Sequence, residues 1–284
     1  MRKKRLFILL LFILGAAATT ALSLARAGLL PGTGERLTIL MYHHIVPDDG
    51  PVNGMTVTVS RFEEDVKWLK AHGYASVLPR ELAAGDPLPR KAVMITFDDG
   101  YASNYTYAFP ILRQQNMKAA IAVVGRVVDA DDEAYLDWDM CREMDASGLV
   151  ELGSHTYDLH NLDGRGGSYD QGGANGIERM AGESREAYEA RVLPDLQKSI
   201  DVIERELGSP VCYLAYPYGA TDPWAEDFIR AHFSVTVLVK SGTANLSGGL
   251  YGLPRKTVTM DSAAADCFGP AAWLRDFWRQ IRNR

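Results

Sequence analysis

The sequence is poor in the features that define several large classes of protein. Its 284 residues include only three cysteines, whose odd number does not make a disulfide framework, although one pair is possible: Cys141, Cys212 and Cys267. No glycine-rich phosphate loop is present, and the formal charge of −6 with scattered basic residues leaves no extended cationic face. The sequence therefore gives no support to a kinase, a nuclease or a nucleic-acid partner.

The N-terminal segment, in contrast, has a strongly asymmetric composition. Basic residues at positions 2–5 precede residues 6–25, an uncharged apolar run long enough to cross a bilayer. Residues 25–27 resemble a small-x-small cleavage site, so residues 1–30 are predicted to be either a cleaved signal peptide or an uncleaved membrane anchor. Because the basic end stays inside, we expect the rest of the chain outside the cytoplasm, secreted or anchored to the outer face of the cell membrane.

Beyond this segment, short apolar runs alternate with stretches of helical periodicity. The runs that read as buried strands span residues 37–42, 75–78, 92–97, 118–124, 149–154, 211–215 and 234–239. Ser60, followed three residues later by Glu63, is a capping box that predicts a helix start. Repeated strand–helix units with apolar rather than alternating strands indicate a parallel sheet covered on both faces. With about seven strands, we predict a single α/β domain, residues 31–284, that folds as a distorted (β/α) barrel.

The main candidates for chemistry are acidic and imidazole side chains at strand ends. Asp98 and Asp99 directly follow one apolar run, and His155 and His160 come after another. Because parallel strands deliver their carboxyl ends to one edge of a sheet, these side chains are expected to meet there. One carboxylate and two imidazoles would form a three-ligand site for a divalent metal, with positions open for water and substrate. Side chains of successive residues diverge, so the other carboxylate is free to act as a base toward a metal-bound water.

Each of these signals also has a simpler interpretation. Asp-Asp-Gly at residues 98–100 is also the composition of a solvated turn. His43, which follows the first strand, either lines the site or supports the structure. Asp158, between the two later histidines, is expected to orient an imidazole or to cap a turn. The turn at residues 216–219 could present backbone amides to a developing oxyanion, but aromatic-proline turns are common.

Taken together, these motifs resemble the metal-dependent polysaccharide deacetylases, carbohydrate esterase family four. The family's three motifs correspond to TFDDG at residues 96–100, the segment containing both later histidines, and YPYG at residues 216–219. Their order and spacing agree, and the resemblance covers most of residues 37–258. MYHHI at residues 41–45 and the form HTYDLH of the histidine segment are most similar to the branch that deacetylates poly-β-1,6-N-acetylglucosamine of biofilms.

The resemblance assigns roles to individual residues. It implies that Asp98 is the general base and that the backbone amide of Tyr218 is an oxyanion donor. The implied ligands of a divalent ion, zinc or a similar metal, are Asp99, His155 and His160. The residues expected to contact the substrate are His43, Tyr101, Tyr216 and Pro217.

Two departures from the family pattern affect this assignment. Many members brace the catalytic aspartate with an arginine two residues before the proline of the third motif, where this chain has Ala215. Arg255 is our candidate replacement, as in the biofilm branch, although it could equally be a surface arginine. The late Leu-x-Leu-His motif that provides the general acid is not visible, so a metal-bound water, protonated Asp98 or His43 could protonate the leaving amine.

The expected function is metal-dependent hydrolysis of N-acetyl groups from a cell-surface glycan, with poly-β-1,6-N-acetylglucosamine as the first candidate. Peptidoglycan GlcNAc and O-acetylated xylan are alternative substrates for the same chemistry. A different alternative is a catalytically silent glycan-binding protein tethered at the membrane, suggested by Ala215 and the missing acid. Retention of both aspartates and both histidines argues for the enzyme.

Overall fold

The computed structural model describes residue 19 and residues 36–130, 132–160 and 176–282 of the chain. Apart from residue 19, the predicted signal peptide or anchor, residues 1–30, lies outside the described residues. Within the described ranges, no helix combines the length and apolar character needed to span a bilayer. The three cysteines are free thiols in this structure.

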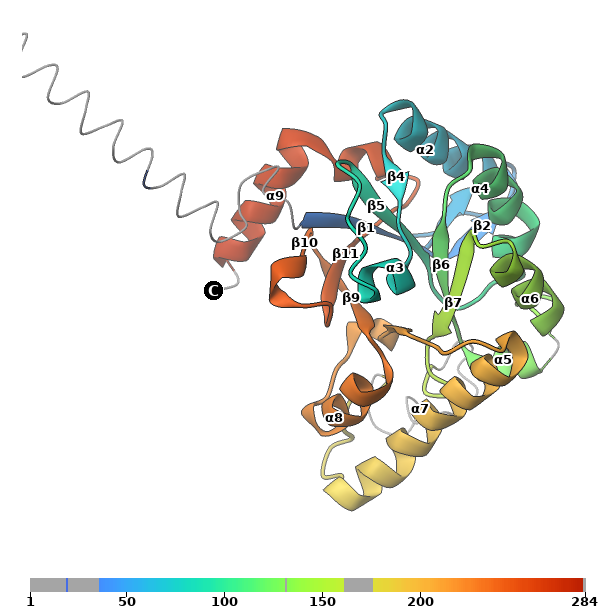
Figure 1. Cartoon of the computed structure of the whole chain (residues 1–284), viewed down its shortest axis with the longest axis vertical. Helices are drawn as coiled ribbons and strands as arrows, with labels where there is room; N and C mark the ends of the chain where they lie inside the picture. Colours follow the sequence, from blue (N-terminus) through green and yellow to red (C-terminus); the bar gives the residue numbers. More distant parts are fainter. Residues whose placement is uncertain (1–18, 20–35, 131, 161–175, 283–284) are drawn as a thin grey trace, which may run out of the picture.

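Seven strands form a closed ring in which every neighbouring pair is parallel (Figure 1). In order around the ring they are β1 (Arg36–Tyr42), β11 (Leu253–Thr257), β9 (Val235–Ser241), β8 (Tyr213–Ala215), β7 (Val150–Ser154), β6 (Ala119–Val123) and β5 (Ala92–Phe97). The pairing of Thr38 with Val93 and its continuation closes the ring between β1 and β5. The predicted barrel of about seven parallel strands is confirmed.

One predicted strand lies outside the ring, and another strand takes its place. The run at residues 75–78 contains only β4 (Ala75–Ser76), which pairs with the first two residues of β5. The extended segment ends there because Pro79 starts helix α3 (Pro79–Ala83). The seventh barrel strand is β11, which carries Arg255. The remaining strands are β10 (Ala244–Asn245), antiparallel to β1, and the pair β2 (His44–Val46) and β3 (Thr56–Thr58).

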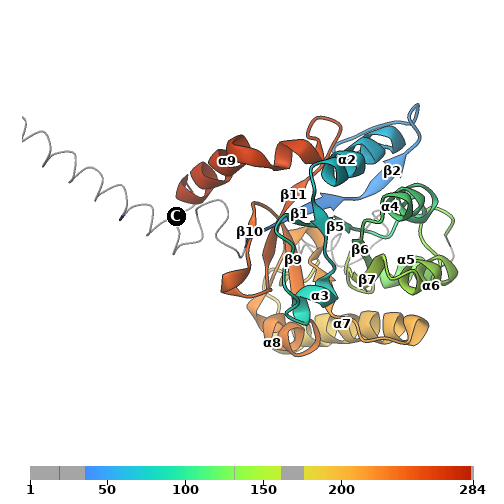
Figure 2. The same cartoon turned by 45° about the horizontal axis from the view of Figure 1, so that its top comes forward.

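Helices surround the barrel, as Figure 2 shows for α7 and α8 along one side and α2 on the other. The longer helices are α2 (Val59–Ala71), α4 (Phe109–Gln115), α6 (Trp138–Ala146), α7 (Arg185–Leu207), α8 (Pro223–His232) and α9 (Gly269–Arg282). Short turns of helix are α5 (Gly125–Asp129), η1 (Asn104–Ala108), η3 (Pro217–Gly219), η4 (Leu246–Gly248) and η5 (Ala264–Cys267). Helix α2 begins before the predicted position, because Thr58 rather than Ser60 caps it by accepting a hydrogen bond from the amide of Arg61.

The strands divide the core into two layers by the alternation of their side chains. One cluster of buried residues, including Met94, Val237 and Leu253, lies inside the ring, and a larger cluster, including Ile95 and Leu214, packs beneath the helices. Thr96 and Asp98 follow Met94 at intervals of two, and Arg255 follows Leu253 in the same way. These polar side chains therefore point toward the barrel interior rather than toward the helices.

A buried carboxylate on α2, that of Asp65, accepts a hydrogen bond from the end of strand β1. Asp65 is 3% exposed and accepts hydrogen bonds from the hydroxyl of Tyr42, at 3.0 Å, and from the amide of Ala264, at 2.9 Å. Burial raises the pKa of Asp65 from 3.8 to about 6, despite these hydrogen bonds. The folded state therefore holds this proton more tightly than the unfolded chain.

We expect the stability contributed by this proton to be present below pH 4 and lost as the pH rises through about 6. Asp65→Asn removes the titration, so between pH 4 and pH 7 the variant should gain about 2–3 kcal/mol of unfolding free energy relative to the parent protein. Urea unfolding of both proteins at the two pH values measures this difference. An equal difference at both values would show that Asp65 does not titrate in this range.

Candidate metal and catalytic centre

Polar side chains that follow three strands of the barrel, β1, β5 and β7, meet at the carboxyl ends of these strands. His43 directly follows β1, Asp98 and Asp99 follow β5, and His155 follows β7. His160 reaches the same place from the loop after His155. The convergence predicted from the sequence is therefore present, and it lies where a parallel barrel collects its functional groups.

Asp99, His155 and His160 form the candidate metal site. The Oδ1 atom of Asp99 lies 3.5 Å from Nε2 of His155 and 3.4 Å from Nε2 of His160, and the three candidate ligand atoms all lie within 4.8 Å of one another. This Oδ1 atom is buried, and no described residue donates a hydrogen bond to it. A buried carboxylate oxygen without a donor is costly, whereas a cation would satisfy it.

The local conformations fit these three residues to a metal. Asp99 and Gly100 both have positive φ angles, 74° and 75°, which turn the chain sharply after β5. The Nδ1 atom of His155 lies 2.8 Å from the carbonyl oxygen of Ala215 and donates its proton there, which leaves Nε2 as a lone-pair donor. Burial and the neighbouring His155 lower the pKa of His160 to about 4, which keeps this imidazole neutral at pH 7. Burial opposes protonation of His155, but the nearby Asp99 and Asp98 raise its pKa, so a metal would compete with a proton for its Nε2 atom. One carboxylate oxygen and two imidazole nitrogens are a donor set that suits zinc.

Asp98 is held by a buried arginine rather than by the metal ligands. The guanidinium of Arg255 donates to both carboxylate oxygens of Asp98, at 2.7 and 2.6 Å. Arg255 is 0% exposed and also donates to the carbonyl of Leu238 and the hydroxyl of Thr96. Burial by itself would raise the pKa of Asp98, but the charge of Arg255 outweighs it and holds this pKa well below its usual range. Asp98 is therefore an ionised carboxylate beside the candidate metal site, and Arg255 is buried rather than on the surface.

The imidazole of His43 lies near the carboxylate of Asp98. Its Nε2 atom is 4.0 Å from Oδ2 of Asp98, and its own backbone carbonyl accepts a hydrogen bond from the side chain of Asn104 at 2.9 Å. The imidazole is 7% exposed, and burial lowers its pKa. Two of the alternatives for the general acid, His43 and Asp98, thus lie next to each other, although 4.0 Å is longer than a hydrogen bond.

The turn at η3 brings one of its predicted residues to the site. Tyr218 has a φ of 59°, is 40% exposed, and stacks its ring on His160 with centroids 4.6 Å apart. The side chain of Tyr216 instead is 1% exposed and donates its hydroxyl to Glu226 on α8 at 2.8 Å, so this side chain packs beneath the turn. Pro217 is also buried. The structure therefore places Tyr218 beside the candidate metal site, whereas the side chains of Tyr216 and Pro217 are buried beneath the turn.

An aromatic wall stands next to Asp99. Tyr101 stacks on His44, with ring centroids 4.6 Å apart, and on Tyr135, with centroids 5.3 Å apart. All three side chains are partly exposed, and burial together with the charge of Asp99 raises the pKa of the Tyr101 hydroxyl. Only Tyr101 was found from the sequence, because Tyr135 reaches it through an isolated bridge that has no local sequence signal.

Asp158, predicted to orient an imidazole or to cap a turn, lies on the outer side of the histidine loop. The side chain of Asp158 points outward, is 50% exposed and pairs with Arg126. The loop is held instead by Asp195 on α7, which accepts hydrogen bonds from the amides of Tyr157 and Asp158. Asp195 carries no motif signal, since it lies on a helix far along the chain.

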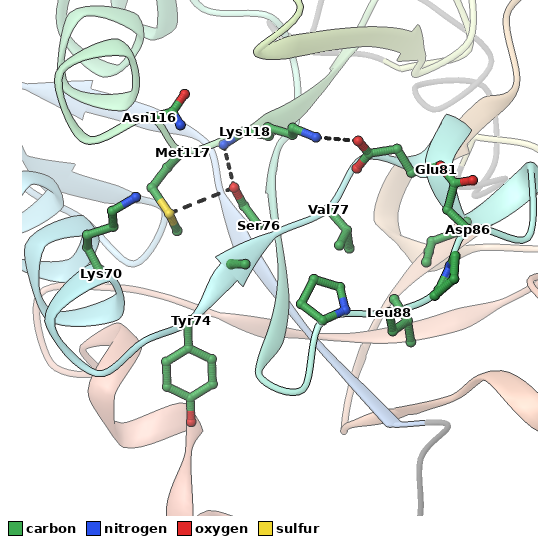
Figure 3. A pocket seen from close by; sticks show the side chains of 14 residues that line it. Lys70, Tyr74, Ser76, Val77, Glu81, Asp86, Leu88, Asn116, Met117 and Lys118 are labelled. Carbon is green, nitrogen blue, oxygen red and sulfur yellow. Dashed lines mark hydrogen bonds and ion pairs between the residues drawn. The ribbon is translucent and has the colours of Figure 1, made fainter.

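A cavity at the other end of the barrel contains none of the predicted site residues. Figure 3 shows this cavity, of about 400 Å³, between β4, α3 and the residues that precede β6. Its polar lining includes Ser76, Glu81 and Lys118, of which the last two form an ion pair. Because β4 pairs with the beginning of β5, this cavity lies at the amino ends of the strands, away from Asp98 and Asp99.

Comparisons with known proteins agree with this arrangement. Residues 85–232 match the family model described as polysaccharide deacetylase. The chain is 30% identical over 265 residues to the poly-beta-1,6-N-acetyl-D-glucosamine N-deacetylase of Escherichia coli (strain K12), with 85% of this chain and 38% of that protein covered. The chain thus spans well under half of that relative's length.

Two solved structures share both the fold and part of the sequence. A de-N-acetylase from Aggregatibacter actinomycetemcomitans superposes with a TM-score of 0.69 at 26% identity, covering 82% of this chain and 98% of that one. IcaB from Ammonifex degensii gives a TM-score of 0.67 at 28% identity, covering 84% and 97%. These neighbours have nearly the whole of their resolved chains in common with the barrel described above.

Proposed function

Because the chain belongs to the polysaccharide deacetylase family, we propose that residues 31–284 form a single catalytic domain that hydrolyses N-acetyl groups of a glycan. One observation carries this proposal. An ionised carboxylate, Asp98, is fixed by Arg255 immediately beside the cluster of Asp99, His155 and His160. A base next to an open three-ligand site is an arrangement suited to metal-assisted hydrolysis of an amide.

Asp99, His155 and His160 would hold the divalent metal, and zinc is the ion that their donor set favours. When bound, the metal supplies Lewis acidity toward the acetyl carbonyl and lowers the pKa of water. The site residues fit this group because the buried Oδ1 atom of Asp99 has no donor among the described residues.

The remaining steps belong to the chain's own residues. Asp98 accepts a proton as the oxygen of water attacks the acetyl carbon, and the backbone amide of Tyr218 donates a hydrogen bond to the developing oxyanion. The carbon–nitrogen bond then breaks, acetate leaves, and the amine nitrogen takes up a proton. Asp98 can return the proton it has accepted, either directly or through His43, whose Nε2 atom lies 4.0 Å away.

For the substrate we propose poly-β-1,6-N-acetylglucosamine, on the outer side of the cell. The named activity of the Escherichia coli relative and the de-N-acetylase neighbour support this choice. The aromatic wall of His44, Tyr101 and Tyr135 supports a sugar ligand, since partly exposed rings beside the candidate metal site offer apolar faces for a pyranose ring. Export through the N-terminal segment would place the enzyme where such a glycan is found.

The test is acetate release from a panel of acetylated glycans, combined with metal analysis of the purified protein. We expect about one divalent ion per chain, release of acetate from poly-β-1,6-N-acetylglucosamine, loss of release after chelation, and recovery on adding Zn²⁺ or Co²⁺. Release from peptidoglycan or acetylated xylan instead would keep the chemistry and change the substrate. Metal-free protein that binds a glycan without releasing acetate would establish the silent binding protein.

A further inference from the structure

Three consecutive backbone amides of the loop between the two histidines have side-chain acceptors. The amide of Thr156 donates to Oγ of Ser154 at 3.0 Å. The next two amides, of Tyr157 and Asp158, donate to Oδ1 and Oδ2 of Asp195 at 2.9 and 2.8 Å. One carboxylate thus spans two successive peptide units of the segment that joins the candidate ligands.

The first of these acceptors is itself tied to the same helix. Oγ of Ser154 lies 2.8 Å from Oγ of Ser199, whose hydroxyl also donates to the carbonyl of Leu196. Ser154 and Ser199 are both 0% exposed. Since Asp195 and Ser199 are four residues apart on α7, they lie on one face of the helix. All three amides are therefore anchored, directly or through Ser154, to a single helical turn.

The loop needs such anchors because its conformation is unfavourable. Thr156 has a φ of 70°, a region that β-branched residues rarely occupy, at a cost of about 1–3 kcal/mol. This conformation turns the following amides to one side, where they can bind an anion between them. On the other side, the carbonyls of Thr156 and Tyr157 accept hydrogen bonds from the amides of Gly125 and Arg126 on α5.

We propose that Asp195 and Ser199 act as a clamp on α7 that sets the position of His160 relative to His155 and thereby the affinity of the site for its metal. The clamp rests on the proposed metal site and adds to it a support outside the family's three motifs. Both are positioning residues, because neither contacts a candidate ligand atom. Without the clamp, Thr156 can leave its unfavourable conformation, and His160 then moves from its place 3.4 Å from Asp99.

The experiment compares metal affinity in full-length variants. Asp195→Asn replaces one acceptor by an amide that faces a backbone N–H, and Ser199→Ala removes the hydroxyl beside Ser154. Asp201→Asn is the matched control, because this exposed aspartate on α7 accepts a hydrogen bond from Gln197 of the same helix. Affinity for Zn²⁺ is measured by competition with a chromophoric chelator, the Co²⁺ form by its visible spectrum, and the metal-free fold by thermal unfolding.

We expect Asp195→Asn to weaken metal binding by about 10–100-fold and to change the Co²⁺ spectrum, with Asp201→Asn unchanged. Ser199→Ala should act in the same direction, and Ser199→Thr, which keeps the hydroxyl, should restore affinity. If Asp195→Asn has a lower thermal unfolding midpoint but unchanged Zn²⁺ affinity and an unchanged Co²⁺ spectrum, the clamp is overturned. If Asp195→Asn does not fold, the two Ser199 variants test the proposal. Equal metal affinity in Ser199→Ala and Ser199→Thr would overturn the clamp, whereas higher affinity in Ser199→Thr would support it.

These readouts separate the clamp from the proposed function. Wild-type protein that binds metal through the clamped loop but releases no acetate from any glycan would refute the deacetylase and leave the clamp standing. If the wild-type protein releases acetate and the clamp variants bind metal as tightly as it does, the deacetylase stands and the clamp is refuted.

Discussion

Replacing Asp98 with asparagine should slow acetate release by a factor of about 10²–10⁴ and leave the metal in place. Asparagine keeps the shape of the side chain but cannot accept the proton that the attacking water must lose. The candidate ligands Asp99, His155 and His160 are untouched by the change. Turnover on poly-β-1,6-N-acetylglucosamine and metal content per chain, measured on the same preparation, test both halves of this expectation.

Two further measurements make the result specific. Asp98→Asn leaves Arg255 buried without a counter-charge, so thermal unfolding must show that the variant is folded at the assay temperature. Asp201→Asn, an exposed change of the same kind on α7, should keep full activity. A folded Asp98→Asn protein that retains its turnover would remove Asp98 from the role of base.

The gathering of Asp98, Asp99, His155 and His160 at one end of the barrel could be predicted from the sequence, because it depends on the direction of the strands. Asp98 and Asp99 end one apolar run, and His155 begins the loop after another. In any closed parallel barrel the carboxyl ends of the strands face the same side, so neither the register nor the side-chain packing needs to be known. The rule places Asp99 and both histidines at the same end of the barrel, whereas their separations of 3.4–3.5 Å also depend on the turns at Asp99 and Thr156.

Arg255 needed information that the sequence hides. Pro254 lies within β11, and the register against β9 shifts at this point, so the segment does not read as a regular strand. Only the known strand shows that Arg255 has the same orientation as Leu253, into the barrel. The sequence alone therefore could not separate a buried partner of Asp98 from a surface arginine.

The sequence also does not show in which direction side chains point outside regular strands. Tyr216 and Tyr218 flank the same proline, yet one packs against α8 and the other stacks on His160, because Tyr218 has a positive φ angle. Asp195 and Asp158 show the same limit, since the support of the loop comes from a distant helix rather than from the motif. Contacts of this kind depend on how α7 and α8 dock on the barrel.

Arg255→Met should lower the free energy of unfolding by about 3–5 kcal/mol, the second large effect that we expect. The substitution leaves Asp98, which is 2% exposed, as a buried carboxylate without its bidentate partner. Urea unfolding of chelator-treated protein measures the loss without a contribution from metal binding. An effect below about 1 kcal/mol would be typical of an exposed ion pair and would contradict the buried pair described here.

The double variant Asp98→Asn with Arg255→Met separates the two functions of this ion pair. Removing both charges avoids an uncompensated buried ion, so the double variant should be more stable than the sum of the two single losses predicts, by about 0.5–3 kcal/mol. Its acetate release should nevertheless be as low as that of Asp98→Asn, because the base is absent. If the double variant regains stability but not turnover, the barrel can fold without this ion pair. The buried position of Arg255 would then serve to keep Asp98 ionised. Losses that simply add would instead show that the two residues act independently, and the base would then need another explanation for its charge.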